Sequence, residues 1–172
     1  MIESNVVRSE SRGTRGEWWA VVLRAIVGYG FIAHGFAKLS RGPDAFAIIL
    51  HALGVAHPQL MAWATILVEL GGGLAVMSGA FMRAVSIPLV VVLLVAMFTV
   101  HLPYGFSSIK LVAVTSAGAQ FGPPGYETDL LYIACLAALV LGGSGPFSVD
   151  RLIARRSRKL QGALGSTEGS LQ

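Results

Sequence analysis

Long apolar stretches alternate with short polar segments along the chain, and this pattern predicts helices that cross a membrane. The apolar stretches cover residues 18–37, 60–82, 85–101 and 127–141. Crossing the hydrocarbon core of a bilayer takes about 20 predominantly apolar helical residues. A further apolar segment, residues 43–54, is too short to cross and is expected to lie in the interface or re-enter it. The expected fold is all-α, an integral membrane four-helix bundle with structured outer loops.

The polar segments divide the chain into a membrane domain and two tails. Residues 1–17 mix charges with Ser and Gly and predict a disordered tail. Residues 18–150 form the predicted four-span membrane domain, and residues 151–172 a basic, flexible tail. The long connection over residues 102–126 contains Gly, Pro and aromatic residues, which favours a structured cap over disorder.

Composition agrees with a membrane protein. Of the 172 residues 54% are hydrophobic and only 13% are charged, whereas about 25% of residues are charged in a soluble domain. The mean hydropathy is +0.68. No basic helix and no RNA-binding aromatic motif is present, so the predicted partner is the lipid bilayer and not nucleic acid.

The distribution of Lys and Arg predicts the orientation of the helices. For four spans, the two tails and the second connection carry nine basic residues, and the first and third connections carry three. The nine are Arg8, Arg12, Arg15, Arg83, Arg151, Arg155, Arg156, Arg158 and Lys159. The three are Lys38, Arg41 and Lys110. Because basic residues concentrate on the cytoplasmic side, both termini are predicted to be cytoplasmic.

The second apolar stretch contains a single acid, Glu69, within a glycine-rich run. Gly72 and Gly73 share its helical face, where an acid would point into the bundle rather than into lipid. Burial disfavours the charged form of this carboxyl group unless His34 or Lys38 pairs with it. The pattern predicts a membrane helix with a buried carboxyl group.

Small residues on the same stretch form a second stripe. Gly71, Ala75 and Gly79 repeat every four residues. In membranes, small residues let a neighbouring helix approach closely. The stretch therefore has two faces on which another helix could pack.

Polar residues gather at the outer ends of the four predicted helices, which is the main chemical signal. They are His34, Lys38, His101, Glu127 and Asp129. Together with Glu69 they could relay protons, bind a polar headgroup or ligate a metal. The alternative is that they form hydrogen-bonded pairs that fix the bundle. No HxxxH or HxH motif supports metal binding, so no metal site is predicted.

At the cytoplasmic end, Arg24 lies inside the first apolar stretch and needs a partner. Asp150 follows the fourth stretch at a similar depth. We therefore expect a structural ion pair between Arg24 and Asp150.

The sequence has no signature of a bound redox cofactor. Cys135 is the single cysteine, so one chain can form neither a disulfide nor a CxxC centre. CxxCH and GxGxxG motifs are also absent, so there is no haem, flavin or nicotinamide signature.

Several residues occur in the order and spacing of a known family. The first helix contributes Arg24, Gly28, Phe31, His34, Gly35 and Lys38, and the second Glu69, Gly72, Gly73 and Gly79. His101 closes the third helix, and the fourth is flanked by Gly125, Tyr126, Glu127, Gly145, Pro146, Ser148 and Asp150. With these residues the chain resembles the DoxX family of four-helix bacterial membrane proteins, from about Arg24 to Asp150.

The resemblance implies a bacterial inner-membrane protein linked to quinone oxidoreductases, such as the membrane subunit of a thiosulfate:quinone oxidoreductase. In that role the expected proton-exchanging residues are Glu69, His34 and His101. The expected substrate-binding residues are Lys38, Tyr126 and Glu127. A soluble or peripheral redox partner would supply the electrons to the quinone.

The rival interpretation is a non-catalytic membrane scaffold or small-molecule carrier. The sequence leaves open whether the chain is itself an enzyme, which donor and partner it uses, and whether it forms a homo-oligomer.

Overall fold

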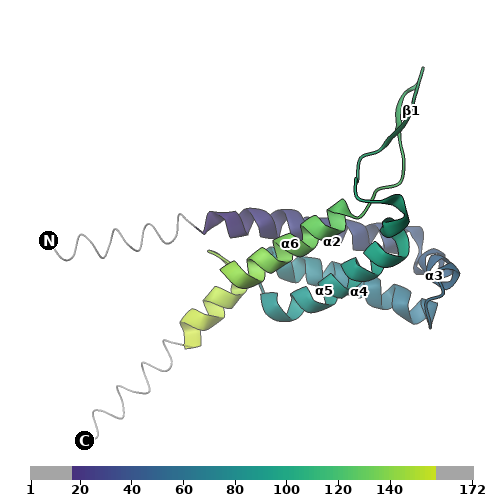
Figure 1. The fold of residues 1–172 in the computed structure, drawn as a ribbon. Coiled ribbons are helices and arrows are strands. Elements are labelled where there is room, and N and C mark those ends of the chain that lie inside the picture. The colour runs from purple at the N-terminus through teal and green to yellow at the C-terminus, as the bar shows by residue number, and fades with distance from the viewer. Residues whose placement is uncertain (1–16, 158–172) are drawn as a thin grey trace, which may run out of the picture.

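The computed structural model describes residues 17–157, and four long helices dominate this part of the chain (Figure 1). They are α2 (Trp18–Arg41), α4 (Pro58–Ser78), α5 (Met82–Ala96) and α6 (Glu127–Gly142). Each corresponds to one of the predicted apolar stretches. The helix of α5 continues through a π-helical turn, η1 (Met97–His101), into a 3-10 turn, η2 (Leu102–Tyr104).

Shorter elements occupy the connections. The short helix α3 (Pro43–Ala52) matches the apolar segment that was predicted not to cross, and Pro43 begins it. The strands β1 (Leu111–Thr115) and β2 (Gly118–Phe121) form an antiparallel hairpin. A last helix occupies residues 149–157, so the first part of the predicted flexible tail is helical.

The hairpin corrects the expectation of an all-α fold. Val112, Val114 and Thr115 are β-branched residues, which favour strand, and Gly118 supplies the turn conformation with a φ of 117°. The long connection is structured as predicted, but it extends away from the helices instead of capping them (Figure 1). Residues 17–157 are therefore mostly helical, with one small sheet.

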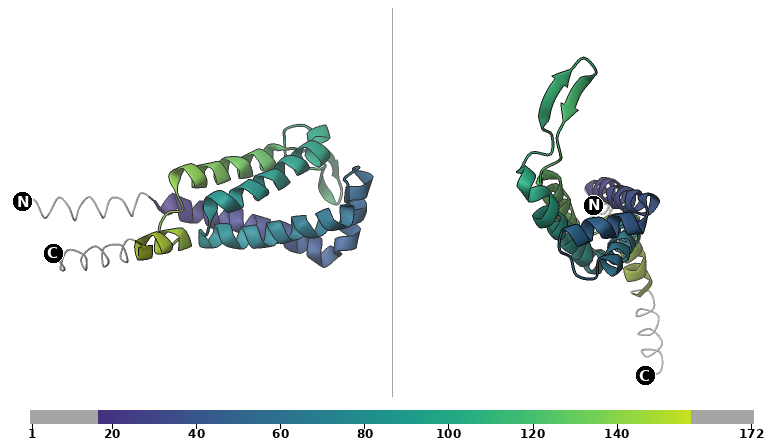
Figure 2. Two further views of the ribbon diagram at one scale, coloured as in Figure 1. Left: turned by 90° about the horizontal axis from the view of Figure 1, so that it is seen from below. Right: turned by 90° about the vertical axis from the view of Figure 1, so that its right-hand side faces the viewer.

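The long helices run back and forth beside one another (Figure 2). α2 packs against α4, α4 against α5, and α6 against both α5 and α2. The start of α2 and the end of α6 lie at the same end of the molecule (Figure 1). We call this the inner end, and the end that holds α3 and the hairpin the outer end.

The closest helix contact is that of α2 with α4, and glycine makes it feasible. A Cβ atom on Gly73 would lie 2.7 Å from the carbonyl oxygen of Gly28, and one on Gly28 would lie 2.7 Å from that of Gly73. Gly72 meets Leu89 of α5 in the same way, at 2.8 Å. In contrast, a Cβ on Gly71 would have nothing within 4 Å. The face that carries Glu69 is thus the packed one, and Gly71 takes no part in helix packing.

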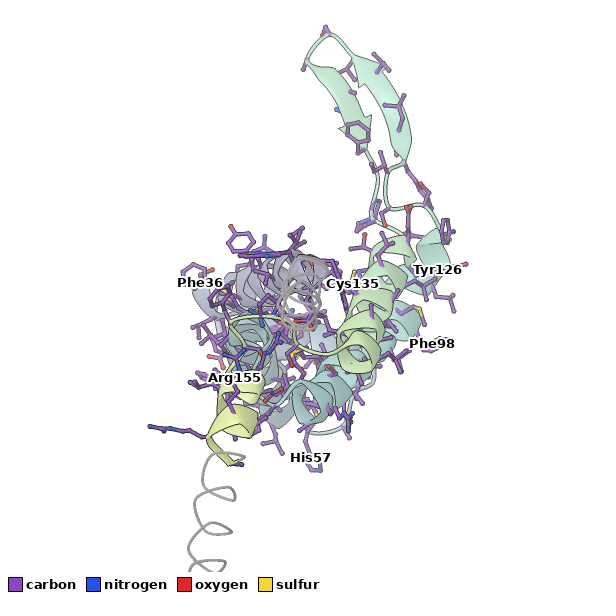
Figure 3. All side chains as sticks on the ribbon, turned by 90° about the vertical axis from the view of Figure 1, so that its left-hand side faces the viewer. Phe36, His57, Phe98, Tyr126, Cys135 and Arg155 are labelled. Atoms are coloured by element: carbon purple, nitrogen blue, oxygen red, sulfur yellow. The ribbon has the colours of Figure 1, made fainter. Side chains whose placement is uncertain are left out.

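The outer surface of the helices is apolar, as a bilayer requires. Among residues 17–157, three helical segments are long and apolar enough to cross a membrane: Trp18–Arg41, Pro58–Ser78 and Met82–Tyr104. Large apolar side chains stand exposed on them, and Figure 3 shows Phe36 and Phe98 on the outside of the helices. At 16 residues α6 is shorter than these segments, so the helices of the membrane domain are not equal in length.

Candidate functional site

An ion pair between Lys38 and Glu69 joins α2 to α4 inside the apolar surroundings. The Nζ atom of Lys38 lies 2.7 Å from Oε1 and 2.6 Å from Oε2 of Glu69. The Glu69 side chain is 6% exposed and that of Lys38 is 25% exposed. Of the two basic partners considered from sequence, Lys38 is therefore the one that reaches the buried carboxylate. The pair has a buried acidic member and a more exposed cationic member.

The local sequence explains how the two helices bring these charges together. Gly35 lies one turn before Lys38, and a Cβ on it would come within 3.1 Å of the Glu69 Cβ. The missing side chain lets α2 approach α4 at this level. The Lys38 Nζ also lies 5.4 Å from the centre of the Phe46 ring on α3, a cation–π distance. Three helices thus position the ammonium group.

A second polar pair joins the end of α5 to the start of α6. His101 Nδ1 lies 2.6 Å from Oδ2 of Asp129. Again the carboxylate is buried, with 6% of the Asp129 side chain exposed, whereas the His101 side chain is 25% exposed. His101 ends the π-helical turn η1, and such turns often occur at functional sites. The contact with Asp129 fixes the orientation of the His101 ring.

Tyr126 and Glu127 lie at the outer end but make structural contacts. The Glu127 carboxylate accepts a hydrogen bond from the backbone N–H of Ser108, at 3.0 Å. The Tyr126 ring packs edge-on against Phe106, with ring centres 5.6 Å apart. Both contacts tie the base of the β1–β2 hairpin to α6. Their role in substrate binding stays a prediction.

The histidines do not converge as the sequence predicted. His34 is exposed on α2 and belongs to neither pair. His51 and His57 are also exposed, in and after α3. Within residues 17–157, no group of three or more His, Cys, Asp and Glu side chains is arranged to hold a metal ion. The outer end therefore has two separate pairs instead of one cluster.

At the inner end the structure differs from the predicted Arg24–Asp150 ion pair. Arg24 is buried, and its Nη1 donates to the backbone carbonyl oxygen of Ser144, at 2.6 Å. The Asp150 carboxylate instead accepts the backbone N–H groups of Phe81, at 2.7 Å, and Met82, at 3.2 Å. No carboxylate oxygen lies within 4.0 Å of Arg24 in the part of the chain that the structure describes. The prediction of a direct pair is wrong because the first N–H groups of α5 need an acceptor, and Asp150 supplies it.

An open hollow of about 380 Å³ lies beside Asp150 at the same end. The first residues of α5 and the last of α6 line it. It is therefore separated from the two polar pairs, which lie toward the outer end.

The family model for DoxX matches residues 19–102. The chain is a DoxX family membrane protein. Among curated proteins and solved structures, no match to it was found.

The DoxX match contains one polar pair completely and half of the other. Lys38, Glu69 and His101 lie inside the matched residues, on α2, α4 and η1. Asp129 and Asp150 follow the matched residues. For the last part of the chain the DoxX pattern proposed from sequence stays a prediction.

Proposed function

We propose that this DoxX protein is a membrane subunit that supports quinone-linked oxidoreduction with a partner that supplies the electrons. The observation that carries the proposal is the Lys38–Glu69 pair, with 2.6 Å between Nζ and Oε2. Charged residues inside membrane helices are expensive and commonly mark ion or proton pathways.

The chemistry assigns a task to each member of the pair. Reduction of a quinone to a quinol takes two electrons and two protons. A soluble or peripheral dehydrogenase supplies the electrons, because the chain carries no signature of its own redox group. The Lys38 ammonium would donate a proton to a quinone oxygen and would be reprotonated from the outer end, where its side chain is 25% exposed. Glu69 would hold the ammonium group in place between these steps through its two contacts with Nζ.

The His101–Asp129 pair is the second proton donor of the proposal. It has the same arrangement of a buried carboxylate and a more exposed nitrogen. The carboxylate orients the imidazole through its contact with Nδ1. Two pairs together match the two protons that each quinone consumes. His34, the third residue expected to exchange protons, is exposed and receives no part in the proposal.

The proposal includes α6 as a fourth membrane crossing in a four-helix bundle. With 16 residues, α6 is about 24 Å long, against a hydrocarbon thickness of about 30 Å. It packs along α5 and α2, and both α2 and the segment from α5 to η2 are long enough to cross. A helix held beside two crossing helices lies at their depth, and local thinning of the bilayer compensates the missing length. The protein is then a multi-pass protein of the bacterial inner membrane with cytoplasmic termini.

Quinone reduction in native membranes tests the function. The soluble fraction of the same cells serves as the electron source, and quinone loss is followed by its ultraviolet absorbance. Glu69→Gln is expected to abolish the part of the rate that depends on this chain, because the amide keeps a hydrogen-bond acceptor but carries no charge to balance the ammonium group. Asp44→Asn is the matched control, since Asp44 is an exposed acid of α3 bonded to Gln59. Equal rates with and without the chain would contradict the proposal.

A second candidate is a non-catalytic scaffold or small-molecule carrier. It is favoured by the fact that Glu69 and Asp129 are each bonded to a residue of another helix, as structural links would be. In that case Glu69→Gln lowers thermal stability, and any change in quinone reduction follows the amount of folded protein. Measuring the melting temperature beside the rate separates the two candidates.

A further inference from the structure

The β1–β2 hairpin extends sideways from the outer end of the helices. Viewed along the helix axes, it reaches far beyond the outline of the bundle (Figure 2, right). Since α2, α4 and the α5–η2 segment are the membrane-crossing candidates, a hairpin that extends sideways from them runs along the membrane surface. This placement rests on the membrane crossing of those helices but not on the quinone chemistry.

The pairing of the strands gives the hairpin two different faces. Residues paired across an antiparallel ladder share a face, and successive residues alternate between faces. One face carries the pairs Leu111–Phe121 and Val114–Ala119, and an irregularity after Leu111 keeps both pairs together. The other face carries Ala113–Gln120 and Thr115–Gly118. The paired residues therefore give one apolar face and one face of small and polar residues, while Val112 is unpaired at the irregularity.

The apolar face has no partner within residues 17–157. Val114 is 75% exposed and Phe121 is 62% exposed. An isolated two-stranded hairpin is at best marginally stable in water, so this face requires a surface to rest on. The exposed apolar surface of the helix before it, at Phe98 and Leu102, leads directly to the connection that carries the hairpin. Along the chain, the apolar face thus follows closely on the exposed apolar surface of a membrane-crossing candidate.

Charge and backbone chemistry limit how deep the hairpin can lie. Residues 102–126 contain one charged side chain, Lys110, and no acid, so the connection suits a neutral or anionic headgroup layer. The outer edges of both strands leave backbone groups unpaired, which excludes the hydrocarbon core. The headgroup layer satisfies both conditions, because it offers water to the edges and apolar contact to one face.

We propose that the β1–β2 hairpin is a lateral anchor whose apolar face rests in the headgroup layer of the outer leaflet. Its base is fixed to the bundle, since the N–H of Gly125 bonds the Ser107 carbonyl at 3.0 Å and Glu127 holds Ser108. The anchor therefore sets the depth and rotation of the outer ends of α5 and α6, where His101 and Asp129 meet.

Spin labels on single cysteines test the anchor in lipid nanodiscs that contain anionic lipid. Cys135→Ala removes the native cysteine, and labels are then placed by Val114→Cys, Thr115→Cys or Leu67→Cys. Val114 and Thr115 are adjacent but face opposite sides of the hairpin, and Leu67 is an exposed residue of α4 that serves as the lipid reference. We expect the label at position 114 to be severalfold less accessible to a water-soluble nickel chelate than the label at 115.

Each of the other possible results contradicts either the anchor or the membrane crossing. Equal nickel access at positions 114 and 115, with the Leu67→Cys label protected, overturns the anchor and leaves the membrane crossing intact. Free nickel access at position 67 overturns the crossing of α4 itself. Protection at position 114 that is accompanied by spin–spin broadening, and disappears in discs with one chain, shows that a second copy covers the face and overturns the lipid contact.

Discussion

At the scale of single residues, the Lys38–Glu69 pair allows a direct energetic test. Lys38→Met leaves the buried Glu69 carboxylate without its counter-ion, and breaking a buried pair in this way costs about 3–5 kcal/mol. In the double variant Lys38→Met, Glu69→Gln both charges are gone, so most of this loss is regained. Chemical unfolding in detergent micelles measures the free energies. A double variant as unstable as the sum of the two single variants would show that the two residues do not interact.

The sequence predicted this residue pair only in part. The position of Glu69 among glycines indicated burial, and the structure bears this out, with 4% of the residue exposed. The sequence does not reveal whether His34 or Lys38 contacts Glu69. Both lie near one helix face, and a small rotation of α2 decides which one meets Glu69. The contact of Gly28 with Gly73 sets that rotation. The partner of Arg24 was missed for a similar reason: it is a backbone carbonyl, which side-chain patterns do not reveal.

At the scale of elements, the glycines of α4 are not equivalent. Gly73→Ala places a methyl group 2.7 Å from the Gly28 carbonyl oxygen, so α2 must move away, and overpacking of this kind costs about 1–3 kcal/mol. Gly71→Ala is the matched control, because nothing lies within 4 Å of the new methyl group. It is expected to leave the melting temperature unchanged or raise it slightly, since alanine is the better helix former. Equal losses for both variants would contradict the packing of α2 on α4.

The start of α5 provides a second prediction for an element. Asp150→Ala removes the acceptor of the Phe81 and Met82 N–H groups, and the loss of such a cap costs about 0.5–2 kcal/mol. Asp150→Asn keeps one carbonyl oxygen and is expected to lose less. Arg24→Ala does not restore the Asp150→Ala variant, because Arg24 bonds the Ser144 carbonyl and not the carboxylate. Folded yield and unfolding free energy measure all three. If Arg24→Ala restored the stability of the Asp150→Ala variant, that result would support a direct ion pair between Arg24 and Asp150.

At the scale of the whole molecule, composition predicted the membrane class and the apolar stretches predicted the long helices. The hairpin was missed because its strands are short and its residues continue the apolar character of the connection. The same apolar pattern is compatible with a cap over the bundle, whereas in the structure the connection extends away from the helices (Figure 1). The direction of a connection depends on the hydrogen bonds at its base, which join residues far apart in the sequence.

The orientation of the chain in the membrane is the prediction that decides between three and four crossings. Nine basic residues on one side against three on the other predict cytoplasmic termini for four spans. A phosphatase that is active only after export should therefore be inactive when fused before Met1 or after Gln172, and active when inserted at the hairpin tip between Ser116 and Ala117. Were α6 to stay on the outer side, the fusion after Gln172 would become active while the fusion before Met1 stayed inactive. That pattern would show that α6 does not cross the membrane. It would also contradict the membrane depth proposed for the contact of Asp129 with His101. We expect both terminal phosphatase fusions to be inactive. A fluorescent protein that folds only in the cytoplasm, fused at the same two positions, is expected to fluoresce.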